Sequence, residues 1–82
     1  MKASEHTVSL PLLAIGEKAR VCNVSSSKDM EIRFCDLGVV PGTVVRAVLS
    51  SPGGNPRAYL IMGSVIAIRN EDARGIMCER IQ

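Results

Sequence analysis

The sequence predicts a mainly β fold: a small, closed or partly closed β-barrel of about five short strands, with one inserted α-helix and a short helical turn before the last strand. Three observations support this prediction. Five runs of aliphatic and β-branched residues are separated by Gly, Pro, Ser and Asn, and only one segment has the apolar spacing of a helix. The segment 58–68 is apolar at nearly every position, and an open sheet edge of that character would aggregate, so closure is expected.

Length and composition limit the chain to one domain. It has 82 residues, of which 46% are hydrophobic, and this composition excludes a disordered chain. Residues 1–7 are polar and are expected to form a flexible arm, so that the domain spans 8–82. The net charge of +2 comes without a clustered excess of Lys and Arg, which argues against a nucleic-acid-binding surface. The sparse charges between Gly42 and Asn70 are expected to form a solvated rim.

The first half of the chain predicts a strand and a helix. Pro11 limits the segment 10–15 to a turn or an edge piece, and a turn at Gly16 leads into a strand at 19–24. The helix is predicted over Lys28–Asp36, with Ser27 as its N-cap and Gly38 as the residue that takes a positive φ at its end. One helical face carries Met30, Phe34 and Leu37.

The second half predicts strands joined by turns. Pro41 and Gly42 suit the centre of a type II turn before a strand at 43–49, in which positions 43, 45, 47 and 49 face one side. A loop is expected at 50–56, followed by a hairpin of 57–62 and 65–69 with Gly63 first in a type II′ turn. Asn70 is expected to cap a helical turn that ends at Gly75, before the closing strand at 76–81.

The order of these segments resembles the FeoA family, small cytosolic accessory proteins of bacterial ferrous iron transport. The resemblance rests on L-x-x-L-x-x-G-x-x-A-x-V from position 10, R-F-C-D-L-G-V-V-P-G-T from position 33, the P-x-G-N-P loop from position 52, and I-A-I-R with the residues that follow it from position 66. It departs from the family pattern at Phe34, Ile68, Asn55 and Cys78, and Asn55 removes a carboxylate from the loop.

The resemblance implies an SH3-like barrel and a non-enzymatic regulator. The implied partner is the membrane ferrous-iron transporter with a GTPase domain, so the protein would be cytoplasmic and peripheral to the inner membrane through that partner. The domain also resembles the C-terminal module of iron-dependent repressors. A chain that starts at Met1 is expected to be the transport accessory rather than a repressor fragment.

The candidate partner-binding residues lie in two segments. The first is the helix and its exit, with Met30, Arg33, Leu37, Val39 and Val40; for Met30 and Leu37 a role in closing the barrel is an equal alternative. The second is the loop, with Pro52, Gly54, Asn55 and Pro56, because it exceeds a minimal hairpin connection. The structural turn residues are expected to be Gly16, Gly38, Pro41, Gly42 and Gly63.

Metal, cofactor and catalytic chemistry are not expected. The three cysteines, Cys22, Cys35 and Cys78, form no C-x-x-C pair and are expected to be buried or half-buried free thiols of a reducing compartment, and His6 lies in the arm. No nucleophile has an adjacent base, and Tyr59, expected to be half-buried at one end of the barrel, is thin support for base stacking. No segment is long enough to insert through a membrane.

Two functional alternatives stay open on the sequence. One is a stand-alone SH3-like module that contacts an iron-dependent transcriptional regulator. The other is a homo-oligomer with a structural role, formed through the apolar hairpin at 58–68.

Overall fold

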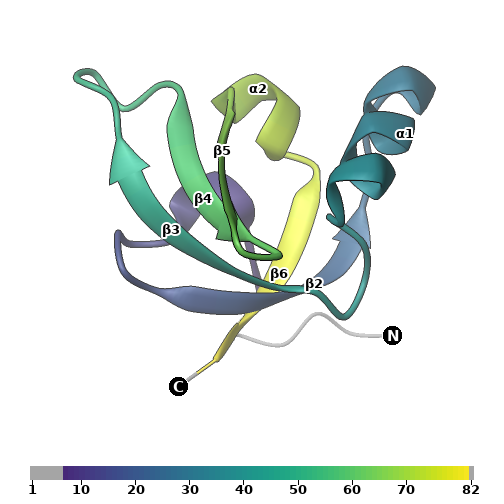
Figure 1. Ribbon diagram of the computed structural model, residues 1–82, viewed down its shortest axis with the longest axis horizontal. Helices are drawn as coiled ribbons and strands as arrows, with labels where there is room; N and C mark the ends of the chain where they lie inside the picture. The colour runs from purple at the N-terminus through teal and green to yellow at the C-terminus, as the bar shows by residue number, and fades with distance from the viewer. Residues whose placement is uncertain (1–6, 82) are drawn as a thin grey trace.

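The computed structural model describes residues 7–81, which form a six-stranded antiparallel sheet with the strand order β1-β6-β2-β3-β4-β5 (Figure 1). The elements in chain order are β1 (Thr7–Ser9), η1 (Leu10–Leu12), β2 (Lys18–Val24), α1 (Lys28–Leu37), β3 (Val44–Ser50), β4 (Arg57–Ile61), β5 (Ser64–Ile68), α2 (Asn70–Ala73) and β6 (Ile76–Ile81). The fold is therefore mainly β, as predicted. The sheet is strongly curved but does not close, because β1 and β5 are its two edges.

The core lies inside this curved sheet and is largely aliphatic. Alternate residues of each strand point inward, as the period of two requires. Two aromatic side chains, Phe34 of α1 and Tyr59 of β4, fill its centre and are 1% and 0% exposed. Of the residues of α1, Phe34 alone is buried, so this one ring anchors the helix to the sheet.

The local predictions for α1 are confirmed. The Ser27 hydroxyl accepts the backbone N–H of Met30 at 3.3 Å, which satisfies one of the free donors of the first turn, and the Glu31 carboxylate accepts the N–H of Ser26, just before the cap, at 3.0 Å. Gly38 ends the helix at φ 90°, and the hydroxyl of Thr43 donates to its carbonyl at 2.7 Å. The turns predicted at Gly16, Gly42 and Gly63 also have positive φ.

The structure adds a sixth strand to the approximately five that were predicted, and the face of Leu49 was predicted wrongly. A sixth strand, β1, pairs Thr7 with Glu79, so one residue of the predicted arm belongs to the sheet; the other six lie outside the described residues. Leu49 is 63% exposed and not on the inner face. The cause is a β-bulge: Ala47 pairs with Tyr59 and Leu49 with Ala58, so Val48 is an extra residue that reverses the alternation after it.

The hairpin between β4 and β5 has a different turn from the predicted one. Met62 and Gly63 form its two-residue loop with φ of 52° and 82°, and two positive φ values are the signature of a type I′ turn. Gly63 is therefore the second central residue and not the first. The first position is held by Met62, the only residue other than glycine with a positive φ between residues 7 and 81.

The segment around α2 also differs from the prediction. Arg69, and not Asn70, is the N-cap residue, and its side chain makes no capping bond. The first helical N–H, that of Asn70, donates instead to the side-chain oxygen of Asn55 in the β3–β4 loop, at 3.0 Å. Gly75 is required by packing, because a Cβ built there would lie 1.6 Å from the carbonyl oxygen of Ser25.

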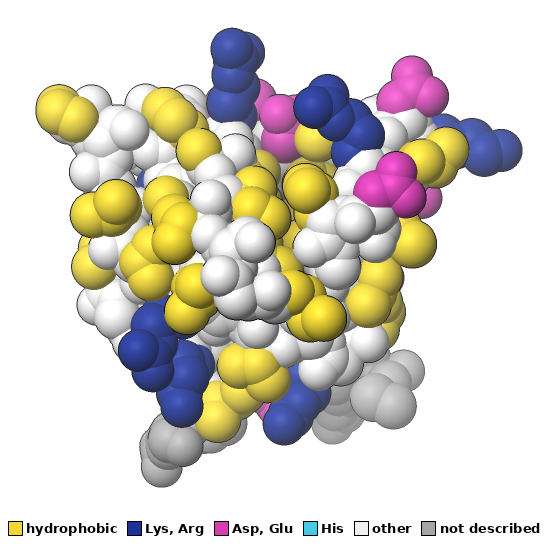
Figure 2. Space-filling view, viewed as in Figure 1, with side chains coloured by type: hydrophobic (Ala, Val, Ile, Leu, Met, Phe, Trp, Pro, Cys, Tyr) yellow, Lys and Arg dark blue, Asp and Glu magenta, His cyan; other side chains and the backbone are white. Residues whose placement is uncertain are grey.

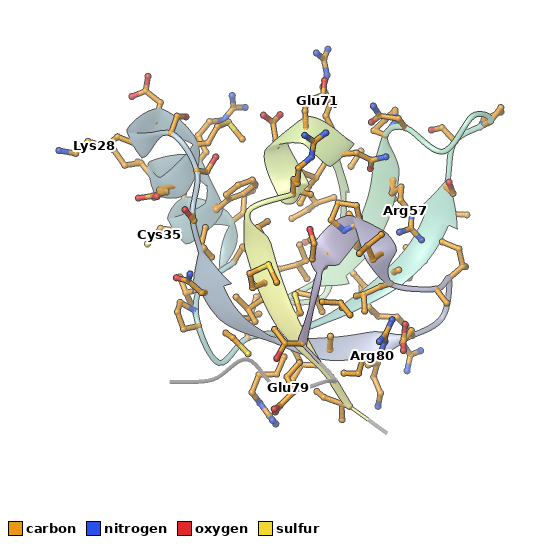
Figure 3. All side chains as sticks on the ribbon, turned by 180° about the vertical axis from the view of Figure 1, so that it is seen from behind. Lys28, Cys35, Arg57, Glu71, Glu79 and Arg80 are labelled. Atoms are coloured by element: carbon orange, nitrogen blue, oxygen red, sulfur yellow. The ribbon has the colours of Figure 1, made fainter. Side chains whose placement is uncertain are left out.

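Arg57 and Tyr59 are core residues rather than rim residues. The guanidinium of Arg57, 9% exposed, donates to the carbonyls of Pro11 and Leu13, the latter at 2.6 Å, and so holds η1 against the sheet (Figure 3). It also lies 5.9 Å from the centroid of the Tyr59 ring. Burial raises the pKa of Tyr59, and the charge of Arg57 partly offsets this shift. These two side chains serve the fold.

Candidate functional site

A groove of about 410 Å³ separates α1 from the β4–β5 hairpin. Its walls are the α1 face that carries the anchor ring and the end of the sheet, with α2 at one end; the lining residues are Met30, Arg33, Phe34, Leu37, Ile66, Ala67, Ile68, Arg69 and Asp72. Three of these, Met30, Arg33 and Leu37, were predicted to contact a partner. The groove is wide enough to receive part of another molecule.

The helix wall is held in place at both ends. Before α1, Ser25 N donates to the carbonyl of Gly75 at 2.9 Å, which joins the helix start to the beginning of β6. After α1, the side chain of Met62 covers Gly38, whose missing Cβ leaves room for Met62 Cγ. The hairpin tip and the helix end are therefore in contact, and the groove between them has a defined width.

The opposite wall is the free edge of the sheet. In a two-residue hairpin the residues that flank the loop, here Ile61 and Ser64, exchange both backbone hydrogen bonds, and this pattern repeats at every second pair. The N–H and C=O groups of Val65 and Ala67 therefore point away from β4. No strand formed by residues 7–81 pairs with this side of β5.

The edge of β5 lacks the features that normally prevent pairing. Its sequence is SVIAI, which contains neither Pro nor a charged residue, and among residues 7–81 neither a helix nor a loop is hydrogen-bonded to it. Arg33 and Arg69 place positive charge around the groove, and Asp72 adds one carboxylate. The site thus offers an unpaired backbone edge, apolar side chains and a net positive border, which together suit an extended polypeptide.

The other predicted contact residues lie elsewhere. Val39 is 1% exposed and packs in the core, whereas Val40 is half-buried, so of these consecutive residues only Val40 reaches the surface. The loop with Pro52, Gly54, Asn55 and Pro56 lies across α2 from α1, so the structure does not bring the two predicted segments into one site (Figure 1). Their partner contacts stay predictions.

Part of the loop has a structural contact of its own. The Asn55 amide donates to the Glu71 carboxylate at 3.1 Å, and the Asn70 amide donates to the carbonyl of Gly54 at 2.8 Å. Pro56 follows Asn55 through a cis peptide bond. Pro52 and Pro56 are both exposed.

Sequence reasoning missed the strand wall of the groove. Ile66, Ala67, Arg69 and Asp72 were not among the candidates. An available signal was the uncharged run SVIAI, since an edge strand without Lys or Pro is uncommon in a protein that acts alone. Recognising it as an edge requires the strand order, which the local sequence does not contain.

The cysteines differ from the prediction in two of three cases. Cys22 and Cys35 are exposed, and only Cys78 is buried. Burial raises the pKa of the Cys78 thiol to about 12. Within residues 7–81 no three His, Cys, Asp or Glu side chains lie close enough to hold a metal ion, and His6 falls outside the described part of the chain. In the same part of the chain, no helix has the length and apolar character needed to cross a bilayer.

Comparisons with known proteins agree with this architecture. The family model of the FeoA domain matches residues 8–80. No curated protein sequence matches the chain. The structure of FeoA from Chlorobium tepidum superposes with a TM-score of 0.87 at 27% identity over 92% of this chain and 71% of that one. FeoA from Stenotrophomonas maltophilia, a zinc complex of an SH3 domain protein described as a candidate activating factor of ferrous iron transport, gives 0.76 at 28% identity over 85% and 87%.

A repressor shares the fold as well. IdeR from T. acidophilum superposes with a TM-score of 0.83 at 18% identity, over 99% of this chain and 37% of that one, which is a likeness of fold alone. The family match spans nearly the whole sequence, and the FeoA structures superpose on most of this chain. The chain belongs to the FeoA family and has its SH3-like fold.

Proposed function

We propose that this chain is a non-enzymatic accessory protein of bacterial ferrous iron transport. Membership of the FeoA family supports the role in iron transport. The finer part of the proposal is the partner: the chain binds the cytoplasmic part of the membrane ferrous-iron transporter that carries a GTPase domain, and is held near the inner membrane through it. The mode of action in this proposal is contact with the partner and not catalysis.

The observation that carries the proposal is the groove between α1 and the unpaired edge of β5. The backbone N–H and C=O groups at the open edge of β5 have no strand partner among residues 7–81. A partner segment that lies along Val65 and Ala67 would form hydrogen bonds with them. Side chains of that segment would then contact Met30 and Leu37 on the helix wall. Arg33 and Arg69 favour an acidic residue at the border.

Docking can regulate the transporter only if it distinguishes two of its states. A ligand shifts an equilibrium by the difference of its affinities for the two forms and by nothing else. The GTP-bound and GDP-bound forms of the transporter are the natural pair to compare. We therefore expect capture of the transporter to depend on the nucleotide.

The test is a pull-down of the detergent-solubilised transporter of the same organism, with this chain as bait, in GDP and in a non-hydrolysable GTP analogue. Leu37→Asp places a charge in the groove, at a side chain that is 40% exposed. Ile32→Asp is the matched control, since Ile32 belongs to the same helix, is 55% exposed and does not line the groove. We expect Leu37→Asp to lower capture by about tenfold or more and Ile32→Asp to leave it unchanged.

Two outcomes would contradict the proposal. If Leu37→Asp captures as much transporter as Ile32→Asp, the interface does not lie in the groove. No capture by the folded wild-type chain in either nucleotide would remove the transporter as partner. In that case size-exclusion chromatography at several concentrations would show whether the edge of β5 pairs with a second copy instead.

A further inference from the structure

A second surface, separate from the groove, lies on the outer face of the sheet. Four large apolar side chains are exposed there, Val44, Leu60, Met62 and Val65, with exposed fractions of 44%, 37%, 75% and 59%. We call them the outer apolar patch. Leu60 pairs directly with Val65 across β4 and β5, and Val44 and Met62 line one shallow hollow of about 280 Å³ with Leu60. They therefore form one continuous surface.

Basic side chains border this patch on β2 and β3. Lys18 and Arg46 are direct cross-strand partners, both exposed, and both line the same hollow. Like charges directly opposite one another destabilise a sheet. Among residues 7–81 no carboxylate lies within ion-pair distance of either side chain. The ion pair of this region joins Arg80 to Glu17 at 2.8 Å. The pair is thus an uncompensated site for an anion.

The remaining charges follow the same division. Arg20 lies on the outer face one row further along β2, opposite Glu79 of β6, and Glu79 is the one carboxylate among the strand residues that face this side. In Figure 2 hydrophobic side chains cover the middle of the face shown; Lys and Arg lie below them and also, beside the visible Asp and Glu, along the upper and right edges. Below the middle of this face apolar and basic groups are therefore next to one another, and Glu79 is the one strand carboxylate on the outer face.

We propose that this face binds the surface of an anionic lipid bilayer. Lys18 and Arg46 would contact lipid phosphates, while Met62, at the hairpin tip, and its apolar neighbours would enter the boundary between headgroups and acyl chains. A free phosphate or a nucleic acid would use the cations and leave the four apolar side chains in water. The binding is adsorption at the interface, with no segment crossing the bilayer.

This inference does not rest on the proposed function, but the two surfaces are compatible. Met62 covers Gly38 at the end of α1, so the outer apolar patch begins where one end of the groove stops. A chain adsorbed through the patch would keep the groove open beside the membrane. It would also be concentrated in the plane where a membrane protein presents its cytoplasmic part.

The experiment is co-sedimentation of the full chain with vesicles of phosphatidylcholine alone and of phosphatidylcholine with phosphatidylglycerol, at low and at high salt. We expect the bound fraction to rise with phosphatidylglycerol and to fall with salt. Arg46→Glu should lower the partition coefficient by about tenfold or more, because charge reversal replaces an attraction with a repulsion. Met62→Asn should lower it by about threefold through the loss of apolar contact, and asparagine accepts the positive φ of the turn, so folding is preserved.

Lys28→Glu is the matched control for Arg46→Glu. Lys28 is exposed at the start of α1 and points away from the sheet, and the variant has the same change in net charge (Figure 3). Vesicle binding should survive this change. An equal loss in Lys28→Glu would mean attraction by net charge alone, and full binding by Met62→Asn would mean that the apolar patch does not take part; either result overturns the proposal. Absence of binding at every phosphatidylglycerol content in low salt also overturns it, and binding to an acidic protein surface would then be the use of this face.

Discussion

The side-chain oxygen of Asn55 accepts the backbone N–H of Asn70 at 3.0 Å, which joins the loop between β3 and β4 to the first turn of α2. The nitrogen of the same amide donates to the Glu71 carboxylate at 3.1 Å. One side chain therefore supplies the cap that α2 lacks from its own N-cap residue, Arg69. The loop that was predicted to contact a partner therefore also stabilises the fold, because it caps α2.

Replacement of Asn55 should destabilise the protein. Asn55→Ala removes an N-terminal cap contact, and we expect a loss of about 1 kcal/mol in the free energy of unfolding, measured by urea titration with circular dichroism. Asn23→Ala is the control, because Asn23 is an exposed asparagine of β2 for which no side-chain hydrogen bond is seen within residues 7–81. Equal free energies of unfolding in the two variants would contradict the role of Asn55 as the cap of α2.

The contacts of Glu71 predict a specific acid dependence. Its own backbone N–H, and next the Asn55 amide, lower the pKa of the Glu71 carboxyl below the usual 4.5. A lowered folded-state pKa stabilises the protein above the unfolded pKa, and this contribution disappears as the pH falls through the folded value. Glu71→Gln should therefore be less stable than the wild type above about pH 4.5 and should converge with it in stronger acid. Parallel curves of urea midpoint against pH would count against this contact.

Replacement by alanine should lower the free energy of unfolding far more at Gly75 than at Gly53. Gly75→Ala places a Cβ 1.6 Å from Ser25 O, so the backbone that joins β2 to β6 must move, and we expect a loss of about 3 kcal/mol or more, or failure to fold. Gly53→Ala meets no atom within 4 Å and bears only the strain of a positive φ, about 1 kcal/mol. Urea unfolding of the purified variants measures both. Similar values would show that Ser25 and Gly75 separate at little cost.

Met62 predicts a stabilising substitution. A side chain at φ 52° in a type I′ turn is strained, and asparagine adopts this conformation more readily. Met62→Asn should raise the free energy of unfolding by about 0.5 kcal/mol, since the Met62 side chain is 75% exposed and little packing is lost. A thermal melt is sufficient to test this. A lowered midpoint would mean that the contact of Met62 with Gly38 outweighs the strain.

The three thiols should separate into two classes. Cys22 and Cys35 are exposed and should react with Ellman's reagent in the native protein, whereas Cys78, with its pKa near 12, should react only after unfolding. Stability should also fall as the pH rises above about 9, because the unfolded chain can then lose the Cys78 proton while the folded chain keeps it. Three equally reactive thiols in the native state would contradict the burial of Cys78.

The sequence predicted the features that local rules control and missed those that depend on pairing. Helix α1 begins after Ser27 and ends before Gly38, as predicted, because an N-cap and a positive φ depend only on residues close together in the sequence. The outward side of Leu49 could not be predicted, since the bulge at Val48 exists only through the register with β4. Arg57 was expected at the rim and is buried, because its acceptors, Pro11 and Leu13, are more than forty positions away along the chain.

Only one wall of the candidate site was predicted, again because the other wall depends on strand pairing. The helix wall follows from the spacing of Met30, Arg33 and Leu37 in the sequence. The strand wall follows only from the order β3-β4-β5, which leaves Ala67 at an edge. The expectation of a closed or partly closed barrel was based on the apolar character of that same segment, and the curved sheet has its open β5 edge at the place where the groove lies.

The pairing of β1 with β6 determines how this domain can be joined to others. Thr7 lies opposite Glu79, so the described chain starts and finishes at one corner of the molecule. A domain with neighbouring ends can be attached through either of them, or inserted into another protein, without a long connecting segment. The fold is in fact found within a longer chain in IdeR, of which this domain covers 37%. Fusion at either end, or circular permutation with the ends joined, should therefore leave the groove and the outer apolar patch unchanged.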